Sequence, residues 1–225
     1  FNLRLLQAVY PLGITTIYHI PPKAWSHGAD RSDILRDNSY LVTSILPFEI
    51  EFFKKRKVPI QFIGNPLKDH VDEYIAAHGN KKQEYKIGIF PGSRKSEIVR
   101  LLPILIEAFV KLHKHENRVR AHLPIAQTLS QDFVRQVAYA AAQKNAVSRS
   151  WIDEHIQMSF GNAYDVMSSA SYAWVCSGTA TLETAFFSTP MCSFYKVNPV
   201  TFWIGKKLVT TIKYFSLVNL CADKL

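Results

Sequence analysis

Short apolar segments alternate with helix-periodic segments along most of this chain. Gly13 to Ile20 reads GITTIYHI and Lys86 to Phe90 reads KIGIF, and both are rich in the residues that favour strands. Glu97 to His115 instead repeats its apolar residues with the spacing of an amphipathic helix. Because strands that alternate with helices through short loops form parallel sheets covered on both faces, the sequence predicts an α/β fold.

A polar segment, Gly79 to Tyr85 (GNKKQEY), interrupts this alternation and follows neither the strand nor the helix period. The sequence therefore predicts two Rossmann-like domains with parallel sheets, one within residues 1–80 and one within residues 86–225. The first of these domains is expected to be incomplete. Sheets of this kind bind ligands at the carboxyl ends of their strands, so functional residues are expected where a strand passes into a helix.

The chain carries a formal net charge of +9 over 225 residues. This excess favours anionic partners such as phosphorylated substrates, acidic lipid headgroups or nucleic acid. Its spread over many segments argues against nucleic acid, because a binding groove concentrates basic residues in one stripe. The three cysteines and the scattered histidines match no ligand spacing, so we expect free thiols, no metal and no cofactor.

The first candidate site is the turn Pro91-Gly92-Ser93-Arg94, which follows an apolar strand and precedes a helix. Backbone N–H groups at a helix N-terminus carry partial positive charge and bind phosphate oxygens. Gly92 would let a phosphate approach the backbone, Ser93 adds a hydroxyl, and Arg94 adds a planar pair of donors. An equally good interpretation is a helix cap, with Ser93 or Ser96 as the N-cap and Glu97 offsetting the helix dipole.

A second turn has the same design and reads Ser177-Gly178-Thr179-Ala180-Thr181, after the strand YAWVC. Two such turns in one sheet could hold a diphosphate from two sides. Glu183 follows within the helix, where a carboxylate can accept hydrogen bonds from both hydroxyls of a ribose. Alternatively, Glu183 is a favourable charge near a helix N-terminus. Neither turn has the spacing of a Walker loop or of a GxGxxG fingerprint.

The segment from Asn198 to Asn219 combines aromatic and basic residues, with Phe202, Trp203, Lys206 and Lys207 on one predicted helix. This combination suits a membrane interface or an acyl chain. The alternative is a helix that packs on the rest of the protein and exposes its lysines, and amphipathic helices in general favour that interpretation.

Together these motifs resemble lipid-A-disaccharide synthase. The resemblance is carried by FPGSRKSEI, SGTATLETAFFSTPM, YKVNPVTFWIGKKLV and YFSLVNL, and earlier in the chain by FNLRL, GITTIYHIPPKAW, LPFEIEFF and VPIQFIGNPL. It implies a glycosyltransferase of the GT-B fold whose C-terminal domain binds UDP-2,3-diacylglucosamine. The enzyme would join this donor to 2,3-diacylglucosamine 1-phosphate with inversion at the anomeric carbon, giving lipid A disaccharide 1-phosphate and UDP, without a metal.

The same resemblance implies roles for individual residues. Arg94, with the backbone of its turn, would stabilise the leaving diphosphate, and Asn219 would lie near the active site. The family's aspartate, a candidate for the catalytic base, would fall immediately before Phe1, so we expect the chain by itself to be inactive. The resemblance also implies a peripheral enzyme on the cytoplasmic face of the inner membrane of Gram-negative bacteria, and it leaves a homodimer open.

Two other classes of function stay open from the sequence. Another UDP-sugar enzyme of the GT-B fold, such as an epimerase, would use the same two turns. A non-catalytic basic module that binds anions or membranes would not need them. The aromatic and basic segment favours an acylated sugar as the substrate, because acyl chains require apolar surface.

Overall fold

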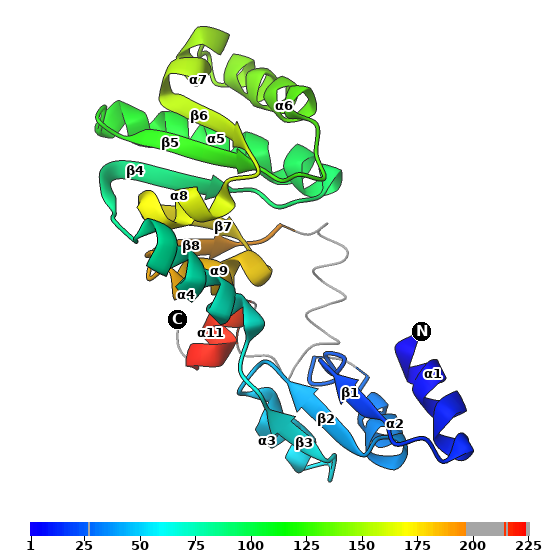
Figure 1. Ribbon diagram of the computed structural model, residues 1–225. Coiled ribbons are helices and arrows are strands. Elements are labelled where there is room, and N and C mark those ends of the chain that lie inside the picture. The colour runs from blue at the N-terminus through cyan, green and yellow to red at the C-terminus, as the bar shows by residue number, and fades with distance from the viewer. Residues whose placement is uncertain (27, 197–213, 215, 224–225) are drawn as a thin grey trace. The chain divides into compact units, whose positions relative to one another are not determined.

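The computed structural model describes residues 1–26, 28–196, 214 and 216–223, and these divide into two compact units. The first unit contains residues 1–68, 214 and 219–223, and the second contains residues 69–196 and 216–218. Each unit is built on its own parallel sheet, as Figure 1 shows. The predicted α/β architecture with parallel sheets is therefore confirmed.

The first unit has a sheet of three parallel strands in the order β1-β2-β3, with Tyr18 opposite Val42 and Thr43 opposite Gln61. Its apolar core takes residues from the strands and from the helices beside them, including Leu6, Leu35 and Phe53. The elements are α1 (Asn2–Val9), η1 (Tyr10–Leu12), β1 (Ile17–His19), α2 (Arg31–Asn38), β2 (Leu41–Ser44), α3 (Glu49–Lys54) and β3 (Ile60–Phe62).

The second unit has a sheet of five parallel strands in the order β6-β5-β4-β7-β8. Its strands are β4 (Gln83–Phe90), β5 (Arg120–Ile125), β6 (Ile156–Phe160), β7 (Ala170–Cys176) and β8 (Met191–Phe194). Its helices are α4 (Pro66–His78), α5 (Lys95–His115), α6 (Gln131–Lys144), α7 (Arg149–His155), α8 (Ala163–Ser169) and α9 (Thr179–Phe186), and α11 (Leu217–Ala222) follows near the end of the chain.

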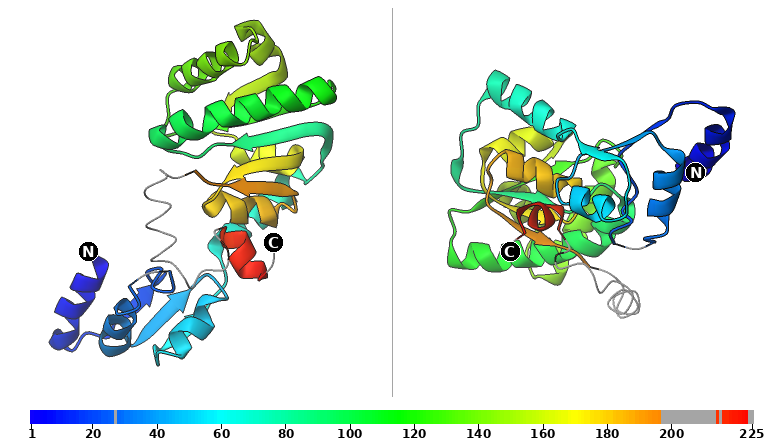
Figure 2. Two further views of the ribbon diagram at one scale, coloured as in Figure 1. Left: turned by 180° about the vertical axis from the view of Figure 1, so that it is seen from behind. Right: turned by 90° about the horizontal axis from the view of Figure 1, so that it is seen from below.

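Helices cover both faces of the second sheet, and Figures 1 and 2 show α5 and α8 on opposite sides of it. One face packs on α5, α6 and α7 through a core that includes Ile89, Phe109 and Leu123. The other face packs on α4 and α8 through a smaller core that includes Val71, Val166 and Phe187. Burial on both faces explains why β4 reads as a continuous apolar run in the sequence.

The strand order of the second sheet determines where a ligand can bind. Numbered along the second unit, its strands follow the order third, second, first, fourth, fifth, which is the doubly wound Rossmann arrangement. The order reverses between β4 and β7. In sheets of this kind a crevice forms outside the carboxyl ends of the two strands at that point, and ligands bind there.

The contacts divide the chain at a different place from the polar segment in the sequence. The division falls between Lys68 and Asp69. It places most of α4 with the second unit because Val71 is buried in that unit's core. β4 already begins at Gln83, inside the segment 79–85 that the sequence predicts as a linker. The boundary predicted from the sequence lies where the chain is polar, whereas the two units are defined by which residues pack together.

Candidate functional site

The two candidate turns lie side by side at the carboxyl edge of the second sheet. β4 and β7 are neighbouring parallel strands, and Phe90 at the end of β4 is paired with Val175 near the end of β7. Pro91 to Arg94 leave the first of these strands, and Ser177 and Gly178 leave the second. The sheet therefore brings both turns to the point where the strand order reverses, as the sequence predicts for a pair that acts on one ligand.

The first turn directs backbone donors at a carboxylate. The N–H groups of Ser93 and Arg94 both donate to Oε2 of Glu97, at 2.9 and 3.1 Å. Gly92 has a φ of +111°, a conformation that L side chains rarely adopt. A Cβ at position 92 would also collide with the Glu97 carboxylate. The turn therefore requires glycine here, because an oxyanion rests against its backbone.

Arg94 completes this arrangement with its side chain. Its Nη1 donates to Oε1 of Glu97 at 2.8 Å, while the Arg94 side chain stays 79% exposed and that of Glu97 only 18% exposed. α5 starts at Lys95 with Arg94 as its N-cap residue, so the predicted capping by Ser93 or Ser96 is wrong. Glu97 does lie in the first turn of the helix, as the capping interpretation expects.

The second turn is held by its own hydrogen bonds. The Ser177 N–H donates to the carbonyl oxygen of Phe194 on β8 at 2.8 Å. The Thr181 hydroxyl is fully buried and donates to the carbonyl oxygen of Gly178 at 2.7 Å. It thus stabilises the start of α9 and does not face solvent. Gly178 is open, since a Cβ there would meet only the Cys176 carbonyl oxygen, at 4.0 Å. Thr179 is exposed and Ala180 half-buried, so the outer surface of this turn consists of small residues.

Glu183 is half-buried on α9 and has a partner that the sequence did not indicate. The Tyr164 hydroxyl, from α8, donates to its Oε1 at 3.0 Å. Burial, together with the neighbouring Glu183 charge, raises the pKa of Tyr164 to about 12, so this tyrosine stays a donor at neutral pH. Tyr164 therefore orients the carboxylate, and the other lone pairs of Glu183 stay available to hydroxyl donors.

Further basic groups surround the first turn. A small cavity of about 100 Å³ beside it is lined by Arg94, Glu97, Arg100 and Lys196, with Ser96, Leu101 and Tyr195. Arg100 lies on α5, one helical turn after Glu97, and donates to the carbonyl oxygen of Lys196 at 3.3 Å. Three cationic side chains thus line a cavity with the single carboxylate of Glu97. The sequence analysis did not indicate Arg100 or Lys196, and Lys196 becomes part of the site only because the chain reaches this cavity after β8.

The remaining predicted site residues lie in other segments of the chain. Asn219 lies on α11, among the residues of the first unit, whereas Arg94 lies in the second unit. Phe202, Trp203, Lys206 and Lys207 lie outside the described residues. Within the described part of the chain, no three His, Cys, Asp or Glu residues are grouped so that they could hold a metal ion. In that same part, no helix is long and apolar enough to cross a membrane.

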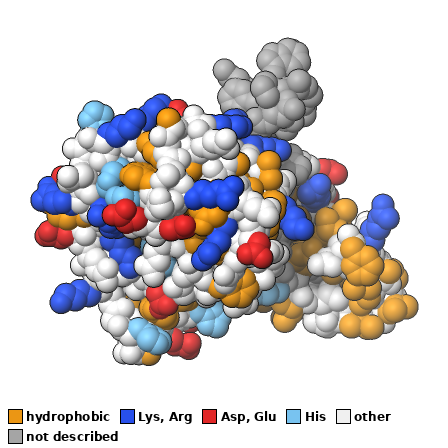
Figure 3. Space-filling view, turned by 90° about the horizontal axis from the view of Figure 1, so that it is seen from above, with side chains coloured by type: hydrophobic (Ala, Val, Ile, Leu, Met, Phe, Trp, Pro, Cys, Tyr) orange, Lys and Arg blue, Asp and Glu red, His pale blue; other side chains and the backbone are white. Residues whose placement is uncertain are grey.

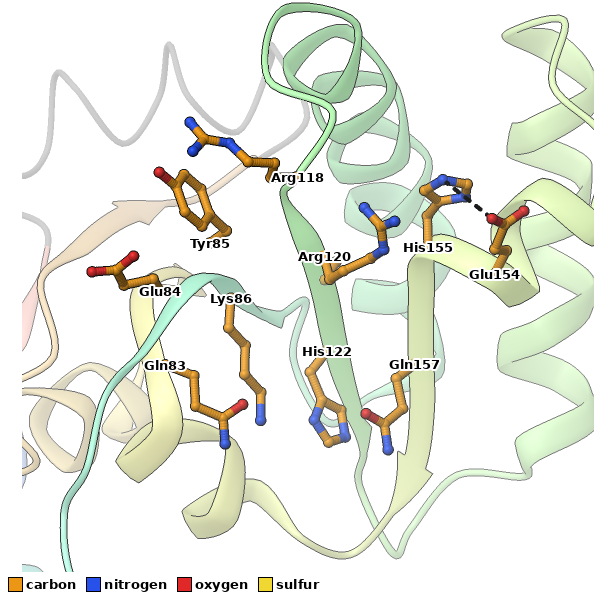
Figure 4. Close-up of a pocket in the computed structure, with 11 residues that line it drawn as sticks. Gln83, Glu84, Tyr85, Lys86, Arg118, Arg120, His122, Glu154, His155 and Gln157 are labelled. Carbon is orange, nitrogen blue, oxygen red and sulfur yellow. Dashed lines mark ion pairs between the residues drawn. The ribbon is translucent and has the colours of Figure 1, made fainter.

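A larger pocket lies at the opposite edge of the second sheet. Its volume is about 410 Å³, and its lining comes from the first halves of β4, β5 and β6, from the end of α7 and from the loop before β5. Figure 4 shows Lys86 and His122 pointing to the same side of the sheet, between Gln83 and Gln157. Since parallel strands share one direction, this pocket cannot belong to the carboxyl-edge site. On the face seen in Figure 3, lysine and arginine side chains are scattered and do not form a single stripe.

Comparison with known proteins gives the family. A sequence model of the lipid-A-disaccharide synthetase family matches residues 1–225, which is the whole chain. The chain belongs to this family. Relatives named lipid-A-disaccharide synthase include one from Sulfurihydrogenibium that is 35% identical over 99% of this chain. Others come from Nitrosococcus oceani and Syntrophus aciditrophicus, 31% and 35% identical over 100% of the chain. The chain spans 56% to 59% of the length of these relatives.

Similarity to solved structures shows the fold of this chain. A Listeria monocytogenes protein assigned as a UDP-N-acetylglucosamine 2-epimerase has a TM-score of 0.57 at 13% identity, covering 98% of this chain and 61% of its own. A co-structure of S. aureus MnaA with UDP has a TM-score of 0.51 at 12% identity, covering 98% of this chain and 68% of its own. The fold is thus of the GT-B type, as the resemblance implies.

Proposed function

We propose that this chain carries the UDP-sugar site of a lipid-A-disaccharide synthase. The enzyme would transfer diacylglucosamine from UDP-2,3-diacylglucosamine to 2,3-diacylglucosamine 1-phosphate. The observation that carries the proposal is the pair of turns at the carboxyl ends of β4 and β7, where the strand order reverses. The family match and the UDP bound to the S. aureus protein of similar fold support it.

In the reaction, the 6-hydroxyl of the acceptor attacks the anomeric carbon of the donor from the face opposite UDP. The new C–O bond forms as the bond to the diphosphate breaks, the anomeric centre inverts, and the hydroxyl proton passes to a base. UDP departs with the electron pair of the broken bond, so negative charge grows on the diphosphate. In this proposal the N–H groups of Ser93 and Arg94, with the Arg94 guanidinium, stabilise that charge without a metal; their bonds to the Glu97 carboxylate support a role in binding an oxyanion.

The second turn supplies the other half of the donor site in this proposal. In the turn from Ser177 to Thr181, which follows β7, the N–H groups of Ser177 and Thr181 donate to the carbonyl oxygens of Phe194 and Gly178. The N–H groups of Gly178, Thr179 and Ala180, which carry small side chains, would therefore be the ones that bind the diphosphate. The Thr181 hydroxyl, being buried, has a structural role here. Glu183, oriented by Tyr164, accepts hydrogen bonds from the ribose hydroxyls.

Further parts of the proposal concern surfaces beyond the two turns. Asn219 is proposed to lie near the reacting groups. The segment with Phe202, Trp203, Lys206 and Lys207 is proposed to contact acyl chains or the cytoplasmic face of the inner membrane. Its lysines, together with the net charge of +9, suit an acidic lipid surface. A homodimer and the absence of nucleic acid as a partner remain parts of the same proposal.

Turnover by the full-length protein tests the proposed reaction. We expect UDP release when both acylated glucosamine substrates are supplied, and none when the acceptor is omitted. Release of UDP only with other acceptors, or epimerisation of a UDP-sugar, would favour another enzyme of the GT-B fold.

Two substitutions test the residues. Arg94→Ala is expected to lower kcat by roughly 100-fold, the effect of losing one charge-stabilising donor. Arg118→Ala serves as its matched control, because Arg118 pairs with Glu116 away from the two turns. Glu183→Gln is expected to weaken UDP binding. If Arg94→Ala leaves both UDP affinity and turnover unchanged, the phosphate role is wrong, and unchanged UDP affinity in Glu183→Gln would refute the ribose role.

A further inference from the structure

One carboxylate occupies two backbone N–H groups of the first turn and one nitrogen of the Arg94 guanidinium. Oε2 of Glu97 accepts from the N–H groups of Ser93 and Arg94, at 2.9 and 3.1 Å, and Oε1 accepts from the Arg94 guanidinium at 2.8 Å. Two oxygens on one carbon thus lie where two phosphate oxygens would lie. The turn can hold an oxyanion, and in this structure Glu97 is that oxyanion.

A diphosphate and the Glu97 carboxylate cannot use this turn together. Each N–H group has one proton to donate, and Gly92 brings the backbone so close that no further atom fits between it and the carboxylate. Two anions at hydrogen-bonding distance from the same donors would also repel each other. Binding of a phosphate ligand through these donors therefore requires the Glu97 side chain to leave.

The structure offers the displaced carboxylate another partner. Arg100 lies three residues further along α5, which places it on the same side of the helix as Glu97. Both side chains line the small cavity, whose wall also includes Lys196. The Arg100 guanidinium donates to the carbonyl oxygen of Lys196 at 3.3 Å, a long contact that leaves its other N–H groups to donate to a carboxylate.

We propose that Glu97 is an internal competitor of the diphosphate and that Arg100 receives its carboxylate when the UDP-sugar binds. This inference rests on the proposed function, since it concerns the same diphosphate site. Return of Glu97 to the Ser93 and Arg94 donors assists the departure of UDP after transfer. Glu97 thereby sets the affinity of the site for both the donor sugar and the product.

Binding measurements on the full-length protein test the proposal. Calorimetry with UDP, with inorganic pyrophosphate and with uridine is carried out on wild type and on Glu97→Gln. Removing the competing charge is expected to tighten UDP and pyrophosphate binding roughly tenfold, because a neutral amide holds these donors more weakly than a carboxylate does. Uridine lacks the diphosphate, so its affinity is expected to stay unchanged.

Arg100→Ala provides the second arm. It removes the partner of the displaced carboxylate, so UDP binding is expected to weaken several-fold in wild type but not in the Glu97→Gln background. Circular dichroism verifies that each variant is folded. If UDP binds to wild type with equal or higher affinity than to Glu97→Gln, Glu97 only shapes the turn and the inference is overturned. If neither protein binds UDP or pyrophosphate, the proposed donor site itself is wrong.

Discussion

Acid is expected to destabilise the second unit through one buried histidine, His122, which is 5% exposed. Its Nε2 lies 2.6 Å from the Ser159 hydroxyl, which itself donates to Oδ1 of Asn162 at 2.5 Å. A serine hydroxyl has one proton, so Nε2–H must donate to Ser159 and Nδ1 must carry the lone pair. Nδ1 is buried and has no hydrogen-bond partner among the described residues. A second proton there would be a buried charge without an acceptor.

Burial, reinforced by the charge of Lys86, lowers the pKa of His122 from 6.5 to about 4. The unfolded chain therefore takes up a proton near pH 6.5, whereas the native unit resists it until near pH 4. The contribution of neutral His122 to the free energy of unfolding is fully present above pH 6.5 and is lost as the pH falls from 6.5 to about 4. Its size is about 2 kcal/mol between pH 7 and pH 5, and its limit at lower pH is about 3 kcal/mol.

Urea unfolding at pH 7, 6 and 5 measures this effect, with tryptophan fluorescence as the readout from Trp151 and Trp174 in the second unit. Wild type is expected to lose about 2 kcal/mol more than His122→Gln over this range, because glutamine does not titrate. His70→Gln is the matched control, because it removes an exposed histidine. The unfolding free energy of this variant is expected to change with pH as that of wild type does. Equal pH dependence in wild type and His122→Gln would refute the reasoning.

Three further predictions concern the second unit. Phe187→Ala removes a fully buried ring that contacts Tyr74 and Tyr164, and is expected to cost about 3–5 kcal/mol of unfolding free energy in thermal or urea melts. Gly92→Ala is expected to lower the unfolding free energy by about 1–3 kcal/mol because alanine is strained at the positive φ of position 92, and to lower it further because the new Cβ collides with Glu97. Gly79→Ala shares the positive φ but has open space around it, so an equal loss in both variants would contradict the collision. Burial, with the Glu97 charge, raises the pKa of Cys176 to about 11, so iodoacetamide at pH 8 should label exposed Cys192 first, as peptide mass mapping would show.

Much of the second unit could be predicted because its signals are local. The apolar run of β4, the glycine in its turn and the amphipathic period of α5 each lie within a short stretch of sequence. The sequence patterns do not indicate the helices α1, α2, α7 and α11. α2 illustrates the reason, since its sequence RSDILRDN is mostly polar and is stabilised as a helix by burying Leu35 in the core of the first unit. The stability of α2 thus comes from its packing in the tertiary structure, because its local sequence pattern favours a helix only weakly.

The candidate site divides in the same way. Two small-residue turns that join strands to helices can be predicted from the sequence, because glycine, serine and threonine at such junctions have local conformational causes. That these turns are neighbours is a result of the tertiary structure, since β4 pairs directly with β7 although β5 and β6 come between them in the chain. The tertiary structure also decided that Tyr164 orients Glu183 and that Lys196, which follows β8, shares a cavity with Glu97. Those contacts depend on strand order and helix packing. Many residues far apart in the sequence determine both, so no single motif indicates them.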